Sequence, residues 1–354
     1  MEERAAFSVA TQYRRHAARR WAFEALLLVL LCLVSLYALN VGSYSLGLSQ
    51  VAQGLVQPQS KAGLVLWGIR LPRITAALLV GAGLGVAGAV MQCLLRNPLA
   101  SPFTMGISHG AMFGACLGIS LIGAGGAESS GRIFVSNPYV VVALAFCGSL
   151  LGVIAVLILA RLRGLSPAAI ILAGIAMGSL FTAGTTLVQY FAEEHELAAM
   201  VYWSFGDLGR PVWRELAVIA GITLPAFAYF NLKRWDYNAM ESGDEAAKSL
   251  GVAVHRDRLI GMLLASLVTA VGVGLVGIIG FVDLICPHAV RLLIGGDHRF
   301  LLPGSALLGA LLLLLADTAA RGIIAPTILP VGVLTSFLGA PMLIYLLVHM
   351  EKRV

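Results

Sequence analysis

Four polar side chains with helical spacing occur inside one long apolar run of the sequence. They follow one another in steps of three, four and three residues: Ser179, Thr182, Thr186 and Gln189. That spacing puts all four on one face of a helix, where hydroxyl and amide groups can line a polar pathway for a solute. Their alternative role is hydrogen bonding between helices inside a membrane. Four such residues in succession favour the pathway.

Ionisable residues are scarce in the apolar runs, where a charge is costly and is normally paired. Asp317 and Arg321 are four residues apart, so an ion pair along one helix accounts for both without any further function. Asp283 lies in the apolar stretch GFVDLICPH, with His288 and Arg291 as candidate partners. Its carboxylate serves either structure or function, and the sequence leaves both open.

No motif in the sequence predicts covalent chemistry. There is no Walker A phosphate loop, no HExxH and no GxSxG. The five cysteines lack CxxC spacing and are expected to be small buried apolar residues, and Cys286 with His288 supplies too few ligands for a metal site. We therefore predict no catalytic residue, no cofactor and no metal. If ATP drives this protein, a partner subunit hydrolyses it.

The composition places these residues in a membrane protein. Hydrophobic residues make up 59% of the 354 and charged residues only 12%, with a mean hydropathy of +0.89; soluble domains are about one-quarter charged. Forty glycines favour helices that pack closely in a lipid bilayer, because small residues let backbones approach. The net charge of +6 does not indicate nucleic-acid binding, because the basic residues stand at the ends of the apolar runs.

About ten apolar runs are candidates for membrane helices, which need roughly 20 residues to cross a bilayer. They lie near 22–39, 64–95, 104–123, 138–160, 168–191, 214–232, 258–282, 284–295, 301–322 and 328–348. The eighth is too short to cross alone, and we expect a broken helix there, buried by its neighbours. The fold class is thus an all-α integral membrane protein with about ten transmembrane helices, several of them short or broken.

Basic residues predict how these helices are oriented. Arg14, Arg15, Arg19 and Arg20 place a cytoplasmic tail at 1–20, followed by a single transmembrane domain at 21–350. Alternation then puts Lys352 and Arg353, and hence the C-terminus, in the cytoplasm as well. Seven basic residues are left on the outer side and need another explanation: Lys61, Arg70, Arg73, Arg132, Arg210, Arg214 and Arg321.

Residues 81–111 and 272–310 form a weak internal repeat. Each is a glycine-rich helix followed by a polar or proline-containing break and a new Gly-Ala start. Five spans separate the two copies, so the halves have opposite topology. Inverted repeats of this kind are typical of transporters.

The longest polar stretch between runs in the second half of the chain covers 235–258, on the predicted cytoplasmic side. Within it, GDEAAKSLG (243–251) is expected to form a short amphipathic helix with Ala246, Ala247 and Leu250 on one side. A solvated loop does not need apolar residues at that spacing. We therefore favour a docking element for a cytoplasmic partner over a plain loop.

Twelve short stretches together resemble the FecCD-type permeases, subunits of ABC importers for ferric siderophores, haem and cobalamin. They follow the family order from about residue 62 onwards: RLPR (70–73), Gly81 to Gly88, Gln92, RNPLASP (96–102), GISHGA (106–111), LGV followed by RDR (250–258), GIIGFV (277–282), PHAVR (287–291), GGDHRFLLP (295–303), ADTAAR (316–321), LPVGVLT (329–335) and GAP (339–341). Chance does not produce so many matches in order.

The resemblance implies partners and a location as well as a fold. The partners are a second copy of the chain, with the pathway at the homodimer interface, two cytoplasmic ABC ATPase subunits and an extracytoplasmic substrate-binding protein. The location is the cell (inner) membrane of a bacterium or archaeon, among membrane lipid and without nucleic acid. The implied function is ATP-driven import of a metal chelate, with ferric siderophore first and haem or a corrinoid such as cobalamin still open.

The resemblance also assigns roles to residues found above. A coupling segment at about 235–256 contacts the ATPase through Gly243, Asp244, Glu245, Ala246, Ala247, Leu250 and Gly251. Arg70, Arg73 and Arg321 receive glutamates of the binding protein. The run at 168–191 lines the pathway, and 197–206 forms a short helix at the outer gate.

Two alternatives rest on Asp283, where the FecCD family usually has glycine. An ion-coupled secondary transporter needs an ion site near the membrane midplane, for which Asp283 with His288 is the only candidate. An intramembrane enzyme would use His109, His288 and Asp283 as metal ligands.

Overall fold

The fold is that of a computed structural model, which describes residues 2–42, 47–121, 125–127, 133–135, 137–324 and 327–350. Arg132, Lys352 and Arg353, which the predicted orientation uses, lie outside the described residues. The described chain is helical apart from loops and one two-stranded antiparallel ribbon, formed by β1 (Gly125–Ala127) and β2 (Ile133–Val135).

Ten helical segments correspond to the ten predicted apolar runs. They are α1 (Glu2–Ala38), a continuous helix from α3 (Lys61–Val65) through a π-turn (Leu66–Arg70) into α4 (Leu71–Leu94), α5 (Ile107–Leu121), α6 (Pro138–Arg161), α7 (Pro167–Phe191), α9 (Trp213–Leu232), α12 (Val254–Val276), α13 (Val282–Ile294), α14 (His298–Gly322) and α15 (Val331–Met350). Seven are long and apolar enough to cross a membrane. The predicted all-α membrane fold is therefore confirmed.

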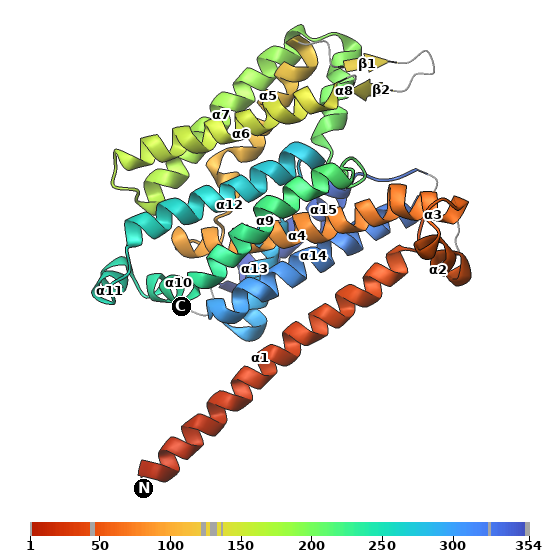
Figure 1. The fold of residues 1–354 in the computed structure, drawn as a ribbon. Coiled ribbons are helices and arrows are strands. Elements are labelled where there is room, and N and C mark those ends of the chain that lie inside the picture. Colours follow the sequence, from red (N-terminus) through yellow and green to blue (C-terminus); the bar gives the residue numbers. More distant parts are fainter. Residues whose placement is uncertain are drawn as a thin grey trace.

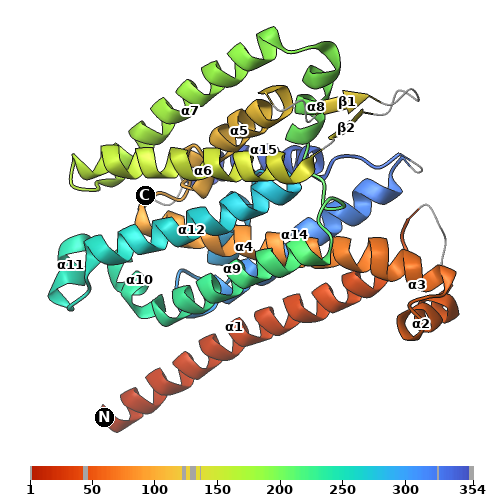
Figure 2. The same ribbon diagram turned by 45° about the horizontal axis from the view of Figure 1, so that its top comes forward.

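Shorter elements occupy the two ends of this bundle. One end, here called the α2–α8 end, carries α2 (Leu48–Val56), α3, α8 (Glu194–Ser204) and the β-ribbon (Figures 1 and 2). The opposite end, the α10–α11 end, carries α10 (Arg234–Glu241), α11 (Asp244–Ser249) and the two ends of the drawn chain. The start of α1 and the end of α15 thus lie on one side of the bundle.

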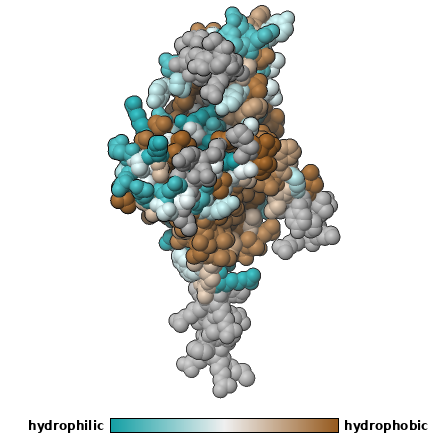
Figure 3. Space-filling model, turned by 90° about the vertical axis from the view of Figure 1, so that its right-hand side faces the viewer, coloured by the Kyte–Doolittle hydropathy of each residue, from teal (hydrophilic) through white to brown (hydrophobic). Residues whose placement is uncertain are grey.

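Helix α4 lies at the centre of the bundle, whereas α1 and α7 lie at opposite edges (Figure 1). The apolar part of the α3–α4 helix is 78% buried, but that of α1 only 17%. Viewed onto the α2–α8 end, apolar and polar side chains gather in separate areas of the surface (Figure 3). The edges therefore leave apolar side chains for lipid or for another subunit.

Glycines allow the central helices to touch backbone to backbone, as the composition predicts. Gly81 of α4 and Gly309 of α14 face each other, and a Cβ on either would collide with the carbonyl of the other. Gly110 of α5 and Gly148 of α6 have the same relation. Any larger residue at these crossings would force the two backbones apart.

One predicted helix ends earlier than expected. The run at 258–282 is helical only to Val276, and residues 277–281 form a non-helical link to α13. Gly277 ends the helix with a φ of 85°, a conformation that glycine adopts without steric cost. Phe281 also has a positive φ, 71°, and its ring occupies the space where Gly339 lacks a side chain.

Two cysteines do not fit the expectation that all five are buried. Cys93, Cys116 and Cys286 are buried, but Cys32 of α1 and Cys147 of α6 are exposed. Both exposed cysteines lie on helices with exposed apolar faces, where a small apolar side chain is as compatible with lipid as with a core.

Candidate translocation and coupling sites

A groove of about 950 Å³ follows the exposed side of α7. Ser179, Thr182 and Thr186 line it, as the spacing predicts, whereas Gln189 is not part of its wall. The other side of the groove is formed by the 3-10 turn Pro102–Met105 and by His109 of α5. His109 had no predicted place in the pathway, although it belongs to the GISHGA motif.

The hydroxyl groups in this α7 groove do not tie helices together. Each donates a hydrogen bond to the carbonyl four residues earlier on α7 itself: Ser179 to Ile175 at 3.0 Å, Thr182 to Gly178 at 2.9 Å and Thr186 to Thr182 at 3.0 Å. Within one subunit, the described contacts thus argue against the interhelical role. The hydroxyl oxygens remain available as acceptors along the groove.

A second candidate site is the tip formed by α11 at the α10–α11 end of the bundle. Gly243 precedes α11 with a φ of 124°, which lets the chain turn sharply from α10 into the new helix. Asp244 and Glu245 occupy its first turn and Lys248 its last, an order that complements the helix dipole. The predicted short helix within 243–251 is therefore present.

Asp244 anchors this tip to the membrane helices. Its carboxylate accepts from Arg258 of α12 at 2.9 and 3.1 Å and from Arg96, just after α4, at 2.6 Å. The Arg258 side chain is only 2% exposed and also donates to the Leu94 carbonyl at 3.0 Å. Hydrogen bonding from Arg258 outweighs burial and holds the pKa of Asp244 below its ordinary value. A movement of the tip would thus be transmitted directly to α4 and α12.

Arg96 and Arg258 are functional candidates that the sequence pattern alone did not predict. Both lie in motifs of the family resemblance, RNPLASP and RDR. Their positive charge, opposite to that of the acidic residues in the polar stretch 235–258, could have indicated that they pair with this stretch. Arg96 adopts a positive φ of 46°. That conformation is uncommon for a residue with a side chain, and it turns the chain beyond α4.

The exposed face of α11 differs from the predicted one. Ala246 and Leu250 are exposed, with Leu250 at 72%, but Ala247 is fully buried in the core. Ala247 follows Ala246 by one residue, which turns its side chain about 100° around the helix. The expectation that all three share one side is therefore wrong, and the exposed apolar pair is Ala246 with Leu250.

The arginines expected to dock a binding protein form a buried cluster at the α2–α8 end. Arg73 pairs with Asp317 at 2.7 Å and with Asp207 at 3.0 Å, and Arg321 pairs with Asp317 at 3.0 Å. The predicted Asp317–Arg321 ion pair is thus confirmed, and Arg73 joins it. The three arginines are only 4–7% exposed, and Arg70 and Arg321 also donate to backbone carbonyls of the segment 38–41.

Asp283 is fully buried and pairs with neither of its predicted partners. Arg291 instead pairs with Glu241 at 2.8 Å, and no hydrogen bond of normal length reaches either oxygen of Asp283. The polar groups around its carboxyl are the Ser101 hydroxyl and the backbone N–H groups of Asp283 and Leu284. Among the described residues, Asp283, His288 and His109 do not form a metal-ligating group. The geometry therefore supports neither alternative that relies on Asp283.

Comparison with known proteins identifies the family. Residues 27–349 match the FecCD transport family. A protein of Methanocaldococcus jannaschii, provisionally named ABC transporter permease protein MJ0087, is 62% identical over 344 residues, which cover 97% of this chain and 99% of that protein. The hemin transport system permease protein HmuU of Yersinia pestis is 37% identical over 332 residues, covering 92% and 95%.

A solved structure shares the fold along nearly the whole chain. It is an inward-facing conformation of a provisionally assigned metal-chelate type ABC transporter, with a TM-score of 0.79 and 30% identity over 93% of this chain and 99% of that one. The chain is thus a multi-pass prokaryotic membrane protein and a non-catalytic permease subunit of an ABC importer. It belongs to the FecCD transport family.

Proposed function

We propose that this chain forms the transmembrane pathway of an importer for a metal chelate, as a homodimer with two cytoplasmic ABC ATPases and an external binding protein. The related hemin permease and the metal-chelate type transporter support the substrate class. Ferric siderophore is the first candidate within that class, with haem and corrinoids as alternatives.

The exposed and anchored tip of α11 is the observation that carries this proposal. Leu250 is 72% exposed where Asp244 is fixed to Arg96 and Arg258. An exposed apolar side chain on a rigid support is suited to fill a groove on another subunit. The segment 235–256 is then the cytoplasmic coupling segment of one transmembrane domain at 21–350, with the tail 1–20 and both termini in the cytoplasm.

The α7 groove supplies the pathway in this proposal. It is open on the edge of the subunit, so a second copy placed against that edge would enclose it. Ser179, Thr182 and Thr186 then offer hydroxyl oxygens without charge, which suits passage of a large chelate without tight binding, and Gln189 continues the polar face of α7 beyond the groove wall. Selectivity is left to the binding protein.

The buried arginine cluster is the docking site for that binding protein. Arg70 and Arg321 bind carbonyl oxygens of the segment 38–41, and carboxylates would compete with these carbonyls, because charged hydrogen bonds are the stronger ones. Arg73 keeps its contacts to Asp317 and Asp207 in this arrangement. Docking then displaces the segment after α1 from the outer end.

The test is isolation of the tagged chain from gently solubilised native membranes. We expect an ABC ATPase and an exported binding protein in the eluate, and the ligand of that binding protein names the chelate. Leu250→Glu should reduce recovery of the ATPase at least tenfold, whereas Val56→Glu, at a similarly exposed position on α2 at the other end, should not. Normal ATPase recovery with Leu250→Glu would refute the coupling role of α11.

A further inference from the structure

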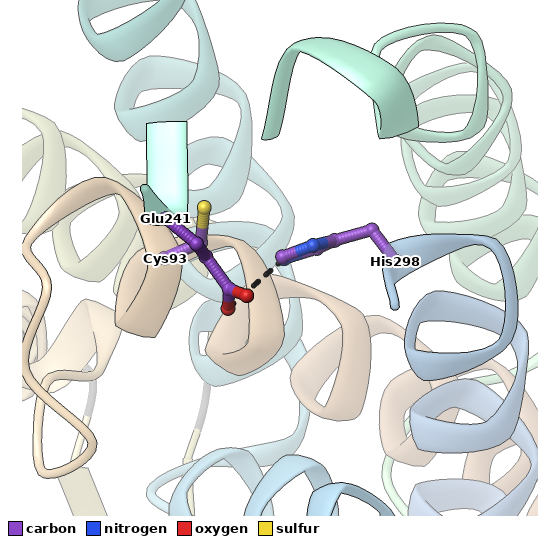
Figure 4. A group of neighbouring side chains, drawn as sticks. All are labelled: Cys93, Glu241 and His298. Carbon is purple, nitrogen blue, oxygen red and sulfur yellow. Dashed lines mark ion pairs between the residues drawn. The ribbon is translucent and has the colours of Figure 1, made fainter. Parts of the chain in front are cut away.

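Three metal-ligating side chains that are distant in the sequence meet beside α11. Cys93 comes from the last turn of α4, Glu241 ends α10, and His298 begins α14. Their ligand atoms all lie within 4.8 Å of one another. Figure 4 shows the imidazole of His298 directed at the carboxylate of Glu241, with the thiol of Cys93 beside it. Cys93 is 2% exposed and His298 is fully buried.

The hydrogen bonds of Asn238 determine which ring nitrogen of His298 carries the proton. Oδ1 of Asn238 accepts from the backbone N–H of His298 at 2.8 Å, and Nδ2 of Asn238 donates to Asp297 at 3.0 Å. These two hydrogen bonds determine the orientation of the Asn238 amide. The same Oδ1 lies 2.9 Å from Nδ1 of His298, which must therefore be the donor. Neutral His298 then has its lone pair on Nε2, as metal-ligating histidines do.

That lone pair has no hydrogen-bond partner among the described residues. It lies 4.0 Å from the carboxylate of Glu241 and close to the sulfur of Cys93, whose thiol donates to the Tyr237 carbonyl at 3.4 Å. Arg291 donates to Oε1 of Glu241 at 2.8 Å, which orients the carboxylate and leaves acceptor positions on Oε2 for an ion. A divalent ion would use the unpartnered lone pair of His298, and Cys93 would lose its proton to become a thiolate ligand.

We propose that Cys93, Glu241 and His298 bind one zinc-like divalent ion. One thiolate, one imidazole and one carboxylate form a ligand set that zinc accepts, with a fourth position left for water. Ligand atoms around tetrahedral zinc are roughly 3.4–3.8 Å apart, so small side-chain rotations close the present spacing. The side chain of Glu241 is 30% exposed, which gives the ion a route from water.

The position of this site has a consequence that rests on the proposed function. The ligands join α4, α10 and α14, and α10 leads directly into α11. A bound ion would hold the coupling segment against the membrane helices and slow its movement. Zinc on the cytoplasmic side would then inhibit transport, an effect called the brake below.

Cobalt titration of the full-length chain in detergent tests the site, because thiolate ligation to Co²⁺ gives a near-ultraviolet charge-transfer band. The exposed Cys32 and Cys147 are first replaced by serine to remove other thiols. We expect saturation at one equivalent and displacement by Zn²⁺. Cys93→Ser should abolish the band, whereas Cys286→Ser, at an equally buried cysteine of α13, should leave it unchanged.

Two further variants separate ligation from folding. Glu241→Gln and His298→Asn should each weaken Zn²⁺ binding at least tenfold in protein that remains monodisperse. A missing band, a band that survives Cys93→Ser, or unchanged affinity in Glu241→Gln would overturn the site. None of these readouts needs an ATPase or a substrate, so failure of the proposed function would not affect them.

Reconstituted transport tests the brake separately. Zn²⁺ should lower ligand-stimulated ATP hydrolysis in the assembled wild-type complex and have at least fivefold less effect with Cys93→Ser. Equal inhibition of both would refute the brake, whatever the cobalt titration shows.

Discussion

At the scale of single residues, Asp317 and Asp283 are two fully buried carboxylates in apolar helices that differ in their ion-pair partners. Asp317 receives two arginines at 2.7 and 3.0 Å, whereas Asp283 has no hydrogen bond of normal length. Burying a carboxyl that has no ion-pair partner is costly, so Asp283 lowers the stability of the fold where Asp317 supports it.

Replacing Asp283 with alanine should therefore stabilise the permease. Loss of a buried carboxyl without an ion pair or a hydrogen bond of normal length is worth about 1–3 kcal/mol, which thermal unfolding in detergent would detect as a higher midpoint. Asp317→Ala is the matched control and should lower the midpoint, because it leaves Arg73 and Arg321 without their shared partner. A loss of transport in Asp283→Ala, with the fold intact, would instead revive an ion-coupling role for this carboxyl.

Acid should weaken the α10–α11 end through Asp297, which precedes α14. Burial raises the pKa of Asp297, but hydrogen bonds from Arg299 and Asn238 outweigh it and lower the pKa to about 2 from an ordinary 3.8. A lowered folded-state pKa contributes stability above about pH 4, and that contribution is lost as the pH falls towards 2. Unfolding midpoints measured across this range should fall more steeply for the wild type than for Asp297→Asn. Parallel curves would contradict the assignment.

At the scale of elements, the crossing of α4 and α14 decides how closely the central helices pack. Gly81 and Gly309 touch through their backbones, whereas Gly221 of α9 has open space where a Cβ would be. A methyl group gains about 0.5–1 kcal/mol of helix propensity at any of these positions. Only at the crossing does it also meet another backbone, at an overpacking cost of about 1–3 kcal/mol.

Gly309→Ala should consequently lower the thermal unfolding midpoint in detergent, and Gly221→Ala should raise it slightly or leave it unchanged. The comparison separates helix propensity from packing, because both substitutions are glycine to alanine inside a membrane helix. Equal shifts for the two variants would mean that the α4–α14 crossing is not tightly packed.

At the scale of the whole molecule, the two edges of the bundle have different roles in the proposal. Helix α7 carries the groove with Thr186 on its wall, and α1 covers the opposite edge (Figure 2). In the proposed homodimer, a second subunit at the α7 edge would enclose a water-filled pathway, while α1 would face lipid. The proposed homodimer therefore makes a prediction about access of water to each edge.

Single cysteines should report that difference. In a chain lacking Cys32 and Cys147, Thr186→Cys should react with a water-soluble thiol reagent in membranes, and Leu28→Cys on α1 should not. Leu28 is 52% exposed in the single chain, so exposure alone would make both react. Similar labelling of the two positions would argue against an aqueous pathway along α7.

The sequence by itself determined the helices and the family. Apolar runs of fixed length allow one structure in a membrane, since only helices or closed barrels satisfy every backbone hydrogen bond there. The family order of twelve short motifs in the same sequence predicted the FecCD family. Two predictions from local pattern were wrong. Ala247 is buried although its neighbour Ala246 is exposed, and the helix predicted to run to residue 282 ends at Val276 because of Gly277.

Only the tertiary structure decided which distant side chains meet. Periodicity places a residue on a face of its own helix, but it does not say which helix that face touches. The sequence therefore predicted only one partner for Asp317, which is Arg321. The second partner, Arg73 of α4, is brought to it by the tertiary fold. Cys93 and His298 likewise became neighbours because the glycine crossing of α4 and α14 sets these two helices side by side, at a spacing that no local pattern encodes.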